Sequence, residues 1–129
     1  MHFTGYKGLL GVLAFALLSS SALAADEIRS DPRMLKLATE SGCLTCHAVD
    51  GGKASPSGDK PIGPAWVDVA KQYRGKPAAS QFLTRVVLEG SNPYNSHWKG
   101  KVSGIAMPPN AVAITEANTR LLVSWILAL

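Results

Sequence analysis

The sequence predicts an all-α domain of about four helices. In several segments apolar residues recur three and four positions apart, the spacing at which side chains share one face of a helix. Prolines and glycines stand at the ends of these segments, where helices begin and stop. No convincing run alternates apolar and polar residues in the manner of a strand. With 129 residues, the chain is long enough for one domain.

The first 24 residues have the composition of a secretory signal peptide. Lys7 gives the N-terminal region a positive charge, and residues 8–18 form an apolar run of 11 residues. Ala22-Leu23-Ala24 fits a small-x-small cleavage site. The run is shorter than the roughly 20 residues that span a bilayer, so we expect cleavage after Ala24 rather than an uncleaved membrane anchor. The predicted organisation is a signal peptide at 1–24 and one domain at 25–129, exported to the periplasm.

The charge of the predicted mature chain is mildly basic. Without Lys7, 12 Lys and Arg residues stand against 9 Asp and Glu residues, a net charge of +3. This balance permits docking on an acidic partner. No basic run or patch is visible, so the sequence gives no reason to expect nucleic-acid binding.

The first helix of the mature chain is expected to begin at Pro32. Asp31 suits the N-cap, and proline suits the first helical position, where no N–H is needed. Apolar residues within 34–38 then share one face. Gly42 is expected to end or loosen this helix directly before Cys43.

The central motif follows at once: Cys43, Cys46 and His47 form a C-x-x-C-H pattern, which is typical of covalent haem attachment. One helical turn separates the thiols, so both can reach the same edge of a porphyrin. Three alternatives remain open. A thioredoxin-like dithiol would need a βαβ setting, half a zinc site would have only His97 as a distant partner, and an exported protein can carry a small disulfide.

Residues 50–63 are rich in Gly, Pro, Ser and Asp and are expected to form a surface loop. Pro64 is expected to start the next helix. Within residues 66–73, apolar and aromatic side chains stand at i, i+3, i+4 and i+7. Gly75 is a credible stop.

Two more helices are predicted downstream. Pro77 is expected to begin the first, whose apolar stripe lies within residues 82–87 and which ends at Gly90. Residues 91–113 hold several prolines and glycines, so they should be irregular, and long irregular segments in small domains usually carry function. Thr115 suits the N-cap of the final helix. The buried face of that helix is predicted to consist of Leu121, Leu122, Trp125, Ile126 and Leu129.

A second iron ligand has three candidates in the mature chain. Met34 stands at helical spacing and is expected in the core. Met107 precedes Pro108 and Pro109, which exclude helix and hold it extended. A thioether on such a loop is well placed to bind iron and would raise the reduction potential. The rival, His97, would give a bis-histidine haem of lower potential.

Taken together, these segments resemble the small bacterial class I cytochromes c, the short monohaem electron-transfer type. The resemblance covers most of the mature chain. Its segments are residues 42–47 (GCLTCH), 62–70 (IGPAWVDVA), Trp98, 107–110 (MPPN) and 122–127 (LVSWIL). It implies the small cytochrome c fold, about four helices wrapped around one haem c bound covalently through Cys43 and Cys46.

The resemblance also implies roles for single residues. His47 would be the proximal iron ligand, and the carbonyl of Pro64 would accept the N–H of its other ring nitrogen. Met107 would be the distal ligand, and Asn110 would form a hydrogen bond near its sulfur. Trp98 would donate its indole N–H to a haem propionate.

Two loops depart from the shortest family members. Residues 50–63 are longer, and residues 91–101 are bulkier than the usual glycine-rich turn. Both are expected near the haem edge, where four lysines, Lys53, Lys60, Lys99 and Lys101, would steer a partner. Arg85 is a candidate for a propionate-binding arginine.

The function that these observations favour is a soluble periplasmic one-electron carrier, not an enzyme. Its partners would be redox proteins such as a dehydrogenase, an oxidase or a reductase, with no stable membrane insertion after signal cleavage. An alternative is a dedicated cytochrome c subunit of a larger periplasmic dehydrogenase complex. A third is a catalytic or gas-sensing haem from which Met107 is displaced.

Overall fold

The computed structural model describes residues 24–51 and 59–129, which form helices joined by irregular segments and contain no strand. The elements in chain order are α2 (Pro32–Glu40), the 3₁₀ turn η1 (Cys43–Thr45), α3 (Trp66–Tyr73), α4 (Ala79–Glu89) and α5 (Glu116–Ala128). The all-α prediction with four main helices is therefore confirmed.

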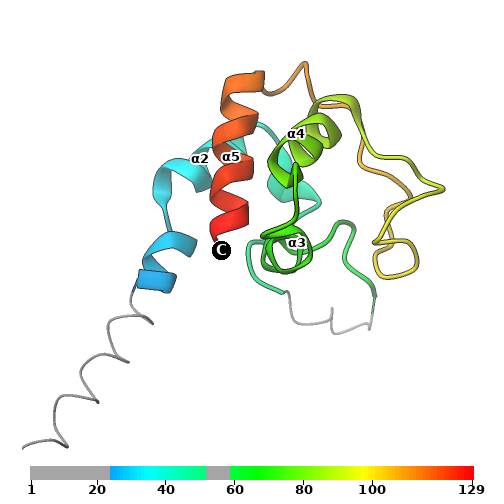
Figure 1. Ribbon diagram of the computed structural model, residues 1–129, viewed down its shortest axis with the longest axis horizontal. Helices are drawn as coiled ribbons and strands as arrows, with labels where there is room; N and C mark the ends of the chain where they lie inside the picture. Colours follow the sequence, from blue (N-terminus) through cyan, green and yellow to red (C-terminus); the bar gives the residue numbers. More distant parts are fainter. Residues whose placement is uncertain (1–23, 52–58) are drawn as a thin grey trace, which may run out of the picture.

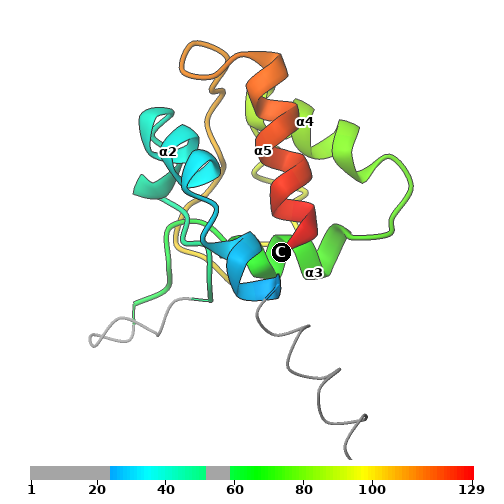
Figure 2. The same ribbon diagram turned by 90° about the vertical axis from the view of Figure 1, so that its left-hand side faces the viewer.

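Helix α5 is the element on which the others pack. It contacts α2, α3 and α4, and Figures 1 and 2 place α2 on one side of it and α4 on the other. The buried core joins Leu122, Trp125 and Ile126 of α5 to Ala38 of α2 and Trp66 of α3. The rings of Trp66 and Trp125 meet edge to face with centroids 5.5 Å apart, a geometry that aromatic pairs favour.

One predicted core position of α5 is wrong. Leu121 is 56% exposed, whereas Val123, which the apolar pattern did not single out, is 1% exposed. Helices pack against α5 from more than one side, so its buried surface is wider than a single stripe and includes Val123. A pattern of one apolar face cannot show where that wider surface ends.

Thr115 caps α5 as the sequence indicates. Its side chain accepts a hydrogen bond from the backbone N–H of Asn118 at 3.3 Å. Replacing Thr115 with alanine removes this acceptor, so we expect the free energy of unfolding to fall by about 1 kcal/mol. Denaturant unfolding of the haem-loaded protein measures it. A Thr115→Ser variant retains a hydroxyl and should stay close to the parent; equal losses in both variants would contradict the capping role.

Helix α2 begins as predicted and leads directly into η1. The side chain of Asp31 accepts a hydrogen bond from the backbone N–H of Arg33 at 2.9 Å, and hydrogen bonds from Arg33 hold the pKa of Asp31 below its usual range. Gly42 follows the helix with a φ of 73°, a left-handed value that glycine adopts without strain. This turn redirects the chain so that Cys43 starts η1.

The predicted signal peptide lies, apart from Ala24, outside the described residues. Residues 24–29 are helical, and the indole N–H of Trp125 donates to the carbonyl of Ile28 at 2.7 Å. Arg29 also forms a salt bridge with Asp50 at 3.3 Å. The segment that we expected to begin the mature chain is thus attached to α5 and to the loop after His47. Across residues 24–51 and 59–129, none of the helices has the length and apolarity that crossing a membrane requires.

The start of α4 differs from the prediction. The helix begins at Ala79 rather than Pro77, because Ala78 has a φ of 59°. A left-handed residue cannot belong to a right-handed helix. Pro77 therefore lies in the turn between α3 and α4.

Residues 91–113 are irregular, as predicted. In Figure 1 this segment swings outward from the end of α4 in yellow and returns in orange to the start of α5. It begins after Gly90, whose φ of 89° ends α4. The segment is therefore fixed at both ends by helices that pack on each other.

Candidate haem-binding site

A cavity of about 430 Å³ lies among η1, α3, α4, α5 and the irregular segment. Its volume falls within the roughly 300–1,000 Å³ usual for ligand and cofactor sites. Six of the seven predicted site residues line it, namely Cys43, Cys46, His47, Pro64, Trp98 and Met107. Segments distant in the sequence thus converge on one space.

The apolar stripe predicted for α4 forms part of the wall of this cavity. Phe82, Leu83, Val86 and Val87 line it, together with Leu122 and Ile126 of α5. The four α4 side chains are not fully buried by protein, and Phe82 remains 40% exposed. An apolar wall that the protein alone does not cover suits a flat, apolar ligand.

Both cysteines of the motif lie at this wall, and neither forms a disulfide within the described residues. Cys43 is half-buried and Cys46 is exposed, and burial raises the pKa of the Cys43 thiol. The backbone N–H groups of Cys46 and His47 donate to the carbonyl of Cys43 at 3.3 and 3.1 Å. This tight turn holds the two thiols and the imidazole at one cavity.

His47 is held in the protonation state that an iron ligand needs. Its Nδ1 lies 2.7 Å from the carbonyl oxygen of Pro64, and since that oxygen can only accept, Nδ1 carries the proton. Burial lowers the pKa of His47, although the bond to Pro64 opposes this shift. The ring also stacks near Trp66, with centroids 6.0 Å apart. A neutral imidazole with its Nε2 lone pair available results.

Gly63 lets the chain approach this imidazole closely. Its N–H donates to the carbonyl of Cys46 at 2.8 Å. A Cβ at this position would lie 2.7 Å from Cε1 and 2.9 Å from Nδ1 of the His47 ring. Any side chain here would push the ring away from Pro64. Glycine is required at position 63 because the His47 ring leaves no space for a Cβ, and not because of its φ angle.

The two loops that carry Pro64 and Met107 are joined to each other. The N–H groups of Ser103 and Gly104 donate to the carbonyls of Pro61 and Ile62 at 2.8 and 3.0 Å. The Lys60 ammonium also donates to the carbonyl of Gly100 at 2.5 Å. Displacing one loop would therefore displace the other.

Met107 is fixed by a residue that the sequence analysis did not select. The N–H of Met107 donates to the Ser91 hydroxyl at 2.8 Å, and the N–H of Ser91 donates to the carbonyl of Met107 at 2.9 Å. Gly90 permits this approach, because a Cβ there would lie 3.0 Å from that same carbonyl oxygen. The position of Ser91, directly after the glycine that ends α4, was the available signal.

Ser91 is therefore expected to hold the Met107 loop against α4. A Ser91→Ala variant loses the acceptor for the Met107 N–H, and we expect about 1 kcal/mol less stability together with faster carbon monoxide binding by the reduced protein. Denaturant unfolding and mixing with carbon monoxide measure the two effects. Ser80→Ala, on an exposed position of α4, is the control; identical behaviour of the two variants would contradict this role.

Asn110 joins the loop after Met107 to α4. Its side-chain amide donates to the carbonyls of Val87 and Pro108 at 3.3 and 2.6 Å, and its backbone N–H also donates to Val87. Asn110 does not line the cavity. Its amide thus links α4, through Val87, to the loop after Met107, through Pro108; a hydrogen bond near the Met107 sulfur stays a prediction.

The other candidate ligand and propionate-binding residues lie in the core or at the cavity. Met34 packs against the buried core, where it was expected. Arg85 lines the cavity, which agrees with its candidacy as a propionate-binding residue. His97 lines the cavity too, but its Nε2 lies 2.9 Å from the Lys101 ammonium. This contact occupies the ring nitrogen nearest to Lys101.

The donor set fits a covalently bound haem. Two thiols, an imidazole with one nitrogen already hydrogen-bonded, and a thioether line one cavity with an apolar wall. Among the described residues, no group of three or more His, Cys, Asp or Glu side chains gathers in a way that could hold a metal ion.

Comparison with known proteins gives a consistent picture. The family model described as Cytochrome c matches residues 35–129. The chain is 38% identical to cytochrome c-551 of Allochromatium vinosum over 95 residues, covering 74% of this chain and 84% of that protein. It is 36% identical to cytochrome c-551 of Pseudomonas aeruginosa over 118 residues, covering 88% and 95%. The crystal structure of Nitrosomonas europaea cytochrome c552 superposes with a TM-score of 0.56 at 33% identity, covering 74% of this chain and 98% of that one.

Proposed function

The chain belongs to the cytochrome c family, and on that premise we propose that it is a periplasmic electron carrier whose haem iron is ligated by His47 and Met107. As a member of this family it carries a covalently attached haem c, transfers electrons and is not an enzyme. The bound haem supplies one-electron chemistry, because its iron alternates between the ferric and ferrous states. Cys43 and Cys46 are the proposed attachment points.

The observation that carries this proposal is the hydrogen bond between His47 Nδ1 and the carbonyl of Pro64 at 2.7 Å. It fixes the tautomer and orients the ring, so Nε2 is the nitrogen offered to iron. The two thiols and Met107 line the same cavity. All the groups that the proposal needs therefore meet at one place.

The protein's task in this proposal is to keep the ligands in place while the charge on the iron changes. Pro64 and Gly63 confine the His47 ring, and Ser91 holds the Met107 backbone. Loops fastened in this way move little on electron transfer. Little reorganisation means a low barrier to electron transfer. With His47 and Met107 as its two axial ligands, the iron would have no open coordination position for a substrate.

Carbon monoxide binding tests the proposal against a catalytic or gas-sensing haem. The purified protein, prepared with its haem, should give one reversible one-electron wave by voltammetry. Its reduced form should bind carbon monoxide slowly or not at all, since Met107 occupies the distal position. Rapid and complete binding of carbon monoxide would contradict the proposed carrier function.

The proposed partner is a redox protein with an acidic docking surface. Lys60 and Lys101 lie in the two joined loops beside the cavity and are exposed, while Lys53 lies outside the described residues. Exposed lysines attract an acidic surface over about 8–10 Å at physiological salt. The rate of electron exchange with such a partner is therefore expected to fall as ionic strength rises.

A further inference from the structure

A short segment in front of α2 contacts the elements that surround His47. Residues 24–29 are helical, and Figure 2 shows them in blue beside the C-terminal end of α5. The segment precedes residue 35, where the match to the cytochrome c family begins. None of residues 24–30 lines the haem cavity, so any effect of the segment on the site has to pass through other residues.

The stronger of its contacts is the hydrogen bond to α5. The indole N–H of Trp125 donates to the carbonyl of Ile28 at 2.7 Å, and Trp125 is only 8% exposed. Leaving a buried donor without an acceptor is destabilising. The salt bridge between Arg29 and Asp50 joins side chains that are 43% and 66% exposed, and exposed pairs contribute little. The indole bond is therefore the contact that fixes the segment.

From Trp125, ring contacts lead to His47. The ring of Trp125 meets that of Trp66 edge to face, with centroids 5.5 Å apart. The ring of Trp66 lies over His47 with centroids 6.0 Å apart and planes 21° from parallel. Trp66 is 4% exposed, and close-packed interiors transmit a displacement from one side chain to the next. Two tryptophans thus connect Ile28 to the imidazole.

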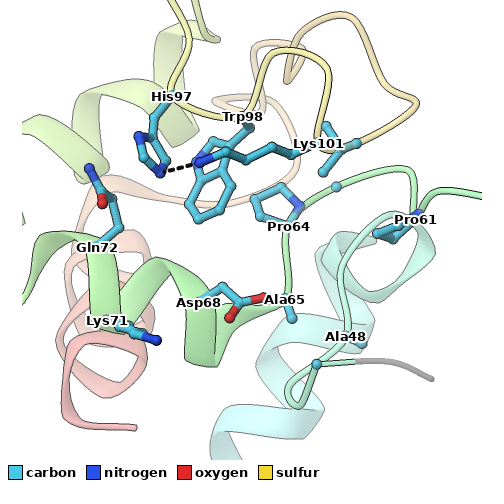
Figure 3. Close-up of a pocket in the computed structure, with 13 residues that line it drawn as sticks. Ala48, Pro61, Pro64, Ala65, Asp68, Lys71, Gln72, His97, Trp98 and Lys101 are labelled. Carbon is cyan, nitrogen blue, oxygen red and sulfur yellow. Dashed lines mark hydrogen bonds between the residues drawn. The ribbon is translucent and has the colours of Figure 1, made fainter. Parts of the chain in front are cut away.

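Trp66 is also joined to the chain that carries His47. Its backbone N–H donates to the carbonyl of Ala48, the residue after His47, at 2.9 Å. Figure 3 shows Ala48 beside Ala65, the residue before Trp66. Because Trp66 contacts His47 through its ring and is tied to the next residue through its backbone, a shift of Trp66 would displace the imidazole.

We propose that residues 24–30 form a positioning segment for His47, which acts through Trp125 and Trp66 to keep the imidazole against the carbonyl of Pro64. The inference rests on the proposed function, in which His47 is the proximal iron ligand. Groups outside the ligand set that orient a ligating histidine are part of a metal site. The segment thus belongs to the arrangement that keeps the ligand in place, although it lies outside the cavity.

The test follows hydrogen exchange of the His47 Nδ1–H by NMR in the reduced, haem-loaded protein labelled with ¹⁵N. The ring signals of His97 are recognised by their loss in His97→Gln. Two variants break the indole bond: deletion of residues 26–29 removes the acceptor, and Trp125→Phe removes the donor but keeps an aromatic ring. Thr115→Ala is the control, because it loses one hydrogen bond at the other end of α5.

The deletion and Trp125→Phe are each expected to speed exchange of the His47 Nδ1–H about fivefold, the factor that corresponds to one ordinary hydrogen bond. The backbone amides of Leu122 and Val123, in the core of α5, report unfolding of the whole protein. Thr115→Ala should speed exchange of these amides alone, since a local opening at His47 does not involve the start of α5.

Combining the two changes tests the route of the effect. Both remove the same hydrogen bond, so the deletion should add nothing to the exchange rate in the Trp125→Phe background. Fully additive effects would mean that the segment does not act through Trp125 and would overturn the proposal.

The proposal is also overturned if the His47 Nδ1–H exchanges at the parent rate in either variant. The same holds if Thr115→Ala speeds it equally, because the ring then opens only with the whole protein. Should one variant fail to fold, the other decides the question alone. Failure of the proposed function has a separate sign: the carbon-bound ring protons of His47 would lie at ordinary NMR frequencies instead of being shifted by the haem ring.

Discussion

A Gly63→Ala variant is expected to lose the ordered contact between His47 and Pro64. The added methyl group would lie 2.7 and 2.9 Å from atoms of the His47 ring and 3.0 Å from the carbonyl of Cys46. Either the ring or the loop must shift, and overpacking of this kind costs about 1–3 kcal/mol of stability. We also expect a lower yield of protein with attached haem, because the proximal imidazole is displaced.

Gly51→Ala is the matched control for this variant. A Cβ at Gly51 meets no atom within 4 Å, and neither glycine has a left-handed φ. The Gly51→Ala variant should therefore match the parent protein in haem yield and in the free energy of unfolding by denaturant, whereas Gly63→Ala should not. If Gly63→Ala keeps both properties of the parent, His47 is not confined as described.

A Met107→His variant is expected to have a much lower reduction potential. Exchange of a thioether for an imidazole removes the ligand that favours ferrous iron. Axial ligands set haem potentials over about 0.8 V, and we expect a fall of roughly a quarter to a half of that range. Voltammetry of the purified protein measures the change.

Met34→Leu is the control for the loss of a thioether. Met34 packs against the core, and a change to leucine nearly preserves its volume. Its potential should equal that of the parent protein. A Met107→His variant with an unchanged potential would show that Met107 does not bind the iron.

The sequence predicted the helices well where local rules decide them. Asp31 and Thr115 cap α2 and α5 as expected, because a capping side chain acts on backbone only two or three residues away. The start of α4 was wrong, since proline also suits turns, and the left-handed turn at Ala78 leaves no signal in a residue that is a good helix former.

The candidate site was predictable where chemistry requires particular residue types. Two thiols, an imidazole and a methionine before two prolines are distinctive, and the structure brings all four to one cavity. Ser91 and Gly63 were not found, because their roles depend on contacts with Met107 and His47 across the fold. The apolar stripe of α4 was predicted within residues 82–87, but not what it packs against, because apolar periodicity does not distinguish protein from cofactor as a neighbour; in the structure it lines the cavity.

The most direct test of the account is the absorption spectrum of the oxidised, exported protein, recorded into the far red. Ligation of the iron by His47 and Met107 predicts a weak sulfur-to-iron charge-transfer band that is absent from Met107→Ala and present in Met34→Leu. A c-type haem spectrum without that band in the parent protein would contradict the proposed ligation and would favour His97 or an open distal position.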